Sequence, residues 1–211
     1  MEIEYNIALA LGLIPFGLYL INRKKVDQTT VYLFPFFILM FVVSVFDPLN
    51  ILYFRINTMV WFRFYMFLEF YCVLYFFYKV LNFKKITILL AITYLLVYVY
   101  LLKGFSFNRL VNDDIPLNLI MALATIALTV QWFIEVFKKM EDIPLYNRSD
   151  FYYISGLLLF YCGTFILFLS LDYLRSNKIS TRPFFLISIY LNIVVRILCS
   201  VTILKFRVKK A

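Results

Sequence analysis

The feature that most constrains this chain is a series of long apolar stretches that recurs along its whole length. A helix that crosses a bilayer needs about 20 mostly apolar residues. Because every backbone polar group within lipid must be satisfied internally, such a stretch is expected to be helical. The sequence therefore predicts an all-α integral membrane protein, a seven-transmembrane-helix bundle forming a single membrane domain (1–211) with no soluble domain. Its seven segments are 5–21, 31–46, 56–80, 86–102, 115–137, 151–171 and 183–204.

The composition agrees with a chain that resides in lipid. Apolar residues make up 64% of the 211 residues and charged residues 16%, whereas soluble domains have roughly 45–50% and about 25%. The 25 phenylalanines and 17 tyrosines suit lipid-facing surfaces and interfacial belts. The N-terminal sequence MEIEYN is acidic, so we expect no cleaved signal peptide. These features predict a multi-pass protein of the bacterial inner (cytoplasmic) membrane.

The orientation follows from the basic residues. Thirteen of the 21 lysines and arginines fall on one side of the predicted bundle and six on the other. Because basic residues accumulate in cytoplasmic loops, we expect the N-terminus outside and the C-terminus in the cytoplasm. The same bias accounts for the net charge of +9, so nucleic acid is not an expected partner. The thirteen are Arg23, Lys24, Lys25, Lys79, Lys84, Lys85, Lys138, Lys139, Arg148, Lys205, Arg207, Lys209 and Lys210.

The absence of histidine removes several classes of function. A chain without histidine cannot build Ser-His or Cys-His nucleophiles, His-based zinc or haem sites, or a histidine phosphoacceptor. The three cysteines, Cys72, Cys162 and Cys199, lie in different segments and are expected to be small buried hydrophobes. We therefore expect no disulfide framework, no metal site and no cofactor.

Two ionisable residues lie alone in the middle of apolar segments. Glu69 is thirteen residues into its segment, roughly 20 Å deep at a rise of about 1.5 Å per residue. Arg196 is twelve residues beyond Phe184, near the start of the last segment on the same side, and so roughly 18 Å deep. Charges at this depth are costly and usually face the protein interior with a partner. A buried pair that fixes helix packing is one interpretation, and it predicts that a charge swap restores part of what each single substitution loses.

The other interpretations are functional: a polar ligand site, a proton or ion pathway, or a charge-gated pore. Every fourth residue of the last segment is polar, from Ser188 through Asn192 and Arg196 to Ser200, so these four share one face, which we expect to look inward. Arg63 is a further candidate and is expected to extend outward along its own stem. Asp47, Glu135 and Asp172 are expected to be boundary charges. The complete set of buried polar, ligand or gating candidates is Glu69, Arg196, Asn192, Arg63, Gln131, Ser188 and Ser200.

Proline and glycine predict local geometry. Pro15 and Pro35 lie within the first two segments and are expected to kink or locally break them. Gly156 and Gly163 are seven residues apart on one helix face, which permits close approach of a neighbouring helix. A single carboxylate at mid-membrane offers no acid–base pair, so we expect no catalytic residues.

Three stretches carry a resemblance to a known family: FRFYMFLEFYCVLYFFYKVLNFKK (62–85), DFYYISGLLLFYCGTFILFL (150–169) and PFFLISIYLNIVVRILCSVTIL (183–204). They resemble seven-helix membrane proteins common in Bacteroidetes, which occur alone and as the membrane part ahead of sensor histidine kinases. The resemblance implies a non-enzymatic signal-input or accessory role. Since the chain ends at Ala211, it also implies a separate cytoplasmic partner, which we expect to dock at 79–85, 138–150 and the basic C-terminus.

Two alternatives stay open. The chain also resembles small multi-spanning proteins encoded beside RNA-targeting CRISPR effectors, which implies an accessory modulator of antiviral defence acting by pore formation, with homo-oligomers. A small-solute or ion transporter is the other alternative. Such a protein is expected to have an internal repeat and broken helices near the midplane.

Overall fold

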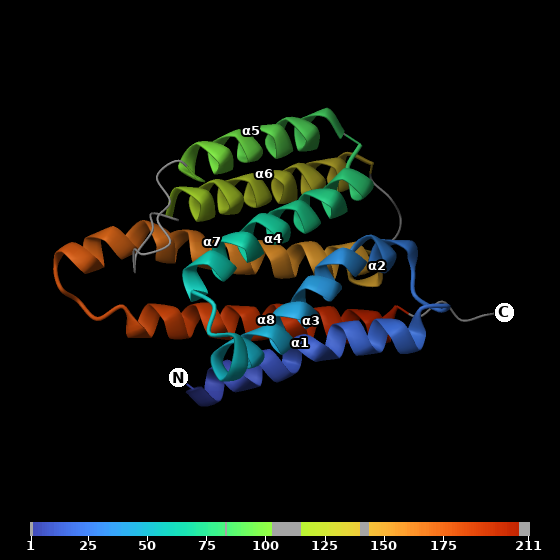
Figure 1. Ribbon diagram of the computed structural model, residues 1–211. Coiled ribbons are helices and arrows are strands. Elements are labelled where there is room, and N and C mark those ends of the chain that lie inside the picture. Colours follow the sequence, from blue (N-terminus) through green and yellow to red (C-terminus); the bar gives the residue numbers. More distant parts are fainter. Residues whose placement is uncertain (1, 83, 103–114, 140–143, 207–211) are drawn as a thin grey trace.

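The computed structural model describes residues 2–82, 84–102, 115–139 and 144–206 (Figure 1). Within these residues seven helices are long and apolar enough to cross a membrane, which confirms the seven predicted spans. Lys103, Arg109, Arg207, Lys209 and Lys210, which entered the charge count, lie outside the described residues. The helices are α1 (Glu2–Asn22), α2 (Gln28–Tyr32), α3 (Phe34–Leu49), α4 (Thr58–Val80), α5 (Lys84–Leu102), α6 (Ile115–Lys139), α7 (Ser149–Ser176) and α8 (Arg182–Lys205).

The second span differs from its predicted bounds of 31–46. The helix breaks at Leu33, and Pro35 lies in the first turn of α3, where its missing N–H is not needed. At its other end, α3 continues into a π-helical turn, Asn50–Phe54, so that the apolar span runs over Phe34–Phe54. The Asn50 side chain then closes the turn by two bonds to the backbone of Ile56, at 2.8 and 3.1 Å. The sequence did not predict this extension, because Asp47 and Pro48 are residue types that are common in loops.

The helices pack against one another in a closed ring. α8 packs against α1 and α7, α7 also packs against α6, and α1 also packs against α3. α4 contacts α3, α5 and α6, and α5 lies at the edge of the bundle (Figure 1). The core between them is rich in aromatic rings, including the fully buried Phe37, Phe70, Phe77 and Tyr161. This arrangement brings α1, α4, α7 and α8 around the residues predicted to be functional.

The two glycines of α7 both face α8. A Cβ atom on Gly156 would lie 3.3 Å from Cδ1 of Leu198, and one on Gly163 would overlap Cδ1 of Leu191. Leu191 and Leu198 are seven residues apart, as are the glycines, so the two antiparallel helices are matched over two turns. The predicted close approach is therefore confirmed, and α8 is the helix that makes it.

One end of the bundle gathers most of the basic side chains. Hydrogen bonds join its connections: Ser149 donates to Asp27, Lys205 Nζ donates to the Tyr146 carbonyl at 3.1 Å, and Asn82 Nδ2 donates to Glu135 at 2.8 Å. Glu135, expected to be a boundary charge, thereby binds the connection between α4 and α5 to α6. We call this surface the basic end, defined by the exposed residues Arg23, Lys24, Lys25, Lys79, Lys84, Lys85, Lys138, Lys139 and Lys205. Its placement in the cytoplasm stays a prediction.

Candidate functional site

Glu69 lies on the inward face of α4 and is 5% exposed. Its neighbours one turn away on the same face, Met66 and Val73, are buried hydrophobic residues, so the carboxylate is surrounded by core. The Tyr161 hydroxyl of α7 donates a hydrogen bond to Glu69 Oε1 at 3.2 Å. Because a buried polar group without a partner is costly, this bond fixes α4 against α7 near the middle of both helices.

Arg196 reaches from α8 into the contact between α1 and α3. Its side chain is 5% exposed, and Nη1 donates a hydrogen bond to the backbone carbonyl of Ala8. Gly12, one turn further along α1, leaves the space that the guanidinium occupies. A Cβ atom there would lie 2.7 Å from Arg196 Nη1 and 3.0 Å from Cζ, and would overlap Ser44 Oγ of α3. Three helices therefore meet at one glycine and one guanidinium.

Glu69 and Arg196 belong to the same electrostatic environment but do not touch. Each contributes to the electrostatic field at the other. Within the described residues, however, no direct ion pair joins them, whereas Arg148 and Asp150 do form one, at 2.7 Å. The direct contact expected from their equal depth is thus replaced by two separate hydrogen bonds, one to a tyrosine hydroxyl and one to a backbone carbonyl.

Asp47, expected to be a boundary charge, is a second buried carboxylate. It is 8% exposed and accepts hydrogen bonds from the Tyr5 hydroxyl at 2.6 Å and from Trp61 Nε1 at 2.8 Å. These donors come from α1 and α4, so Asp47 joins three helices. Its charge also acts on Arg196. We call Tyr5, Asp47, Trp61, Glu69, Tyr161 and Arg196 the polar cluster.

The polar face of α8 formed by Ser188, Asn192, Arg196 and Ser200 points to the interior, as predicted, but only Arg196 is fully buried. Ser188, Asn192 and Ser200 are half-buried, while the opposite face of the helix exposes residues such as Ile187, Ile197 and Val201. The Ser200 hydroxyl donates to the carbonyl of Arg196 at 2.8 Å. Ser200 therefore satisfies its own helix and supports Arg196 only through the backbone.

The two remaining candidates are Arg63 and Gln131. Arg63 is 4% exposed, which corrects the expectation that its side chain extends outward. Its position on the buried side of α4 holds it inside the bundle, where it has interactions of its own. Gln131 is half-buried on α6, and no hydrogen bond among the described residues connects it to Glu69 or Arg196. The side chain of Asp172, expected to be a boundary charge, lies outside the described residues.

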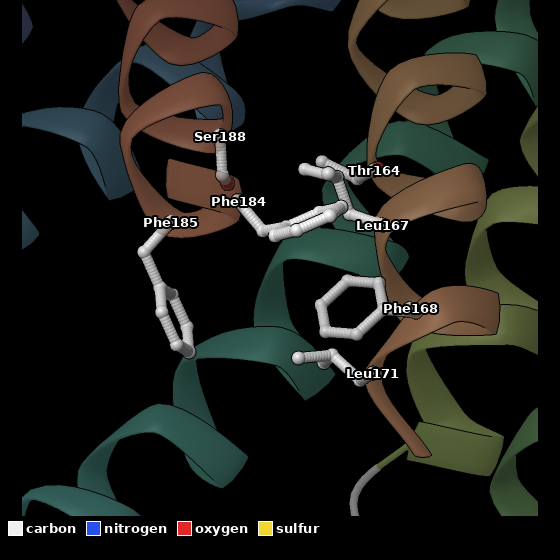
Figure 2. Close-up of a pocket in the computed structure, with 7 residues that line it drawn as sticks. All are labelled: Thr164, Leu167, Phe168, Leu171, Phe184, Phe185 and Ser188. Carbon is white, nitrogen blue, oxygen red and sulfur yellow. The ribbon is translucent and has the colours of Figure 1, made fainter. Parts of the chain in front are cut away.

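A small pocket opens between α7 and α8 beside the polar cluster. Figure 2 shows the side chains of both helices converging on it. The pocket begins next to the close contact of Gly163 with Leu191. Beyond this contact, no further glycine of α7 allows α8 to approach closely. Two hydroxyl-bearing residues and five apolar ones surround it: Thr164, Ser188, Leu167, Phe168, Leu171, Phe184 and Phe185.

Sequence reasoning missed the residues that bind the two charges. Tyr161 is one of 17 tyrosines, and no pattern in the sequence separates it from the others. A signal did exist for α1: Ala8 and Gly12 are small residues four apart, a spacing that allows helices to approach closely in membranes. The burial of Asp47 was not predicted, because the predicted segment ended at 46, one residue before it.

The chain matches no protein-family model, and neither a curated protein nor a solved structure is significantly similar to it. The resemblances to Bacteroidetes seven-helix proteins and to CRISPR-associated membrane proteins therefore stay predictions.

Proposed function

We propose that this multi-pass membrane protein is a non-enzymatic signal-input or accessory component that acts on a separate cytoplasmic partner. The observation that supports the proposal is the bonding of the polar cluster. Its charges are buried on different helices, and they bind neutral donors and a backbone carbonyl instead of one another. A small shift of α1, α4, α7 or α8 would give Arg196 a carboxylate partner in place of the Ala8 carbonyl.

Such an exchange has the properties that a switch needs. Polar groups in a low dielectric must keep a partner, so an intermediate position between two bonding patterns is costly. Packed helices with two alternative bonding patterns are bistable and amplify a small displacement. An input at the cluster would thereby change the spacing of four helices together.

The basic end is the surface that would present this change to a partner. Two of the acidic residues described at this end are engaged internally, since Asp27 accepts from Thr30 and Ser149, and Asp150 pairs with Arg148. The nine exposed lysines and arginines of the basic end favour an acidic partner surface. The carboxylates Glu69 and Asp47 have separate donors on separate helices, which favours a packing and switching role over acid–base catalysis.

The experiment that tests this function is site-specific photocrosslinking in living cells of the native host. A photoreactive amino acid replaces Lys79, Lys84 or Lys205 at the basic end, and Lys178 at the opposite end as the matched control. We expect the same protein to be captured from all three basic-end positions, to be absent from Lys178, and to be lost when Arg196→Gln is added. Adducts to lipid alone, or capture from Lys178 as well, would contradict the proposal.

A further inference from the structure

We propose that Lys79 and Lys84 form a binding site for the phosphate of an anionic phospholipid, at the ring of Tyr78. Lys79 lies at the end of the candidate span Val60–Val80, and Lys84 begins the span Lys84–Leu102. Both lysines therefore lie at the boundary where lipid headgroups meet their acyl chains. Their helices, α4 and α5, are neighbours, and α5 lies at the edge of the bundle, where lipid can reach it (Figure 1).

Two positive charges gather at one aromatic ring in this site. Lys79 Nζ lies 5.9 Å from the centroid of the Tyr78 ring, and Lys84 Nζ lies 5.4 Å from the same centroid. The face of an aromatic ring attracts a cation, but two like charges at one ring repel each other. A single anion held by both ammonium groups would relieve this repulsion.

The described residues provide no such anion. Within them, neither lysine forms an ion pair or a side-chain hydrogen bond. Glu135 reaches the connection between the two lysines, but its Oε2 already accepts two hydrogen bonds from Asn82, at 2.8 and 3.3 Å, and its Oε1 is buried. The charge of the pair is therefore available to an anion from outside the chain.

Tyr78 adds a hydrogen-bond donor to the two charges. Its side chain is half-buried, and its hydroxyl makes no hydrogen bond within the part of the chain that the structure describes. A phenolic hydroxyl can donate to a phosphate oxygen. Two ammonium groups and one hydroxyl thus suit an anion with several acceptor oxygens.

The surface that continues from Lys84 selects a lipid over free phosphate. Ile88, Ile92 and Leu96 follow Lys84 at intervals of four residues along one side of α5, and all three are exposed. They carry the apolar surface roughly 18 Å from Lys84, at about 1.5 Å per residue. This length covers half of a hydrocarbon core of about 30 Å, which is the reach of one acyl chain.

The charge of the site also selects among lipids. A phosphocholine headgroup carries its own cation, which the two ammonium groups would repel, so we expect an anionic headgroup such as phosphatidylglycerol. Binding of this lipid does not depend on the function proposed above. A partner can dock at the basic end at the same time, because the pair is only part of that surface.

Photolabelling of the full chain in phosphatidylcholine nanodiscs tests this inference. The probes are trace amounts of phosphatidylglycerol and phosphatidylcholine that carry the same diazirine in the same acyl chain. We expect phosphatidylglycerol to label α5 more strongly. Combining Lys79→Gln with Lys84→Gln should lower its labelling by about five- to thirtyfold, the effect of removing two lysines beside an anionic lipid.

The matched control combines Lys138→Gln with Lys139→Gln, which removes the same charge from exposed positions at the same end. We expect this control to leave labelling of α5 unchanged, and thermal midpoints in detergent to show that both variants are folded. Equal losses in the two variants, or equal labelling by the two lipids, would overturn the inference and indicate general attraction to the membrane surface. Displacement of the lipid by inorganic phosphate would also overturn it, since the acyl chain would then contribute nothing.

The test is separate from the partner-capture experiment, because it uses purified protein. Selective lipid labelling without partner capture would contradict the proposed function and leave the lipid site standing. Partner capture without lipid selectivity would contradict the lipid site alone.

Discussion

Because residue 12 is a glycine without a Cβ atom, α1, α3 and α8 can approach one another closely around it. The Arg196 guanidinium and Ser44 Oγ occupy the volume that a side chain at Gly12 would need. The guanidinium cannot simply move away, because its Nη1 is bonded to the carbonyl of Ala8. Gly12 is thus the residue on which the position of the buried cation depends.

Gly12→Ala is predicted to destabilise the protein by about 1–3 kcal/mol, the usual cost of overpacking a filled site. Gly17→Ala is the matched control on the same helix, because nothing lies within 4 Å of a Cβ atom there. The control should be neutral or stabilising by up to about 1 kcal/mol, since alanine is the better helix former. Thermal unfolding in detergent measures both, and equal midpoints for the two variants would contradict the geometry around Arg196.

A second prediction at the residue scale concerns the partners of Glu69. Double-mutant cycles should give a larger coupling energy for Glu69→Gln with Tyr161→Phe than for Glu69→Gln with Arg196→Gln. Groups in contact couple by roughly 0.5–3 kcal/mol, and groups that do not touch couple less. A charge swap of Glu69 and Arg196 should restore little, because a carboxylate at 196 would face the Ala8 carbonyl. The opposite order of coupling energies would indicate a direct ion pair.

At the scale of elements, the α7–α8 pair has two close contacts of unequal tightness. A Cβ atom on Gly163 overlaps Leu191, whereas one on Gly156 stays 3.3 Å from Leu198. The tighter contact is also the one beside the pocket. We infer that the spacing of α7 and α8 is most sensitive to change at Gly163.

Gly163→Ala is accordingly predicted to lower the thermal midpoint more than Gly156→Ala, because Leu191 must leave its rotamer while Leu198 needs to give only slightly. Both substitutions are identical in chemistry and lie on the same helix, so each serves as the control for the other. A larger effect at Gly156 would show that the α7–α8 contact is arranged differently.

The parts of the fold that the sequence predicted are those that follow from long-range patterns. Seven apolar segments give seven spans, and two glycines at helical spacing mark a close contact. The missed parts depend on one tertiary contact each. In the sequence, Asp47 resembles a loop residue. In the structure it accepts hydrogen bonds from Tyr5 and Trp61, which are 42 and 14 residues away along the chain. Similarly, equal depth placed Glu69 near Arg196 but could not specify that each binds a different group.

For the whole molecule, the basic end is predicted to lie in the cytoplasm. Lys24 is exposed at this end and Lys178 at the opposite end, and each can be replaced by cysteine after the native Cys72, Cys162 and Cys199 are changed to alanine. In intact cells a membrane-impermeant maleimide should label Lys178→Cys and not Lys24→Cys, and lysis should make Lys24→Cys reactive. Labelling of Lys24→Cys in intact cells would reverse the orientation.

The central claim is that the polar cluster sets the arrangement of the helices at the basic end. Its most direct test is the distance between spin labels at Arg23→Cys, which directly follows α1, and Leu204→Cys on α8. Both positions are exposed, and Arg196 joins the two helices. Arg196→Gln should shift or broaden the distance distribution in lipid nanodiscs, while Gly17→Ala leaves it unchanged. An Arg196→Gln distribution identical to that of the parent protein would contradict the claim.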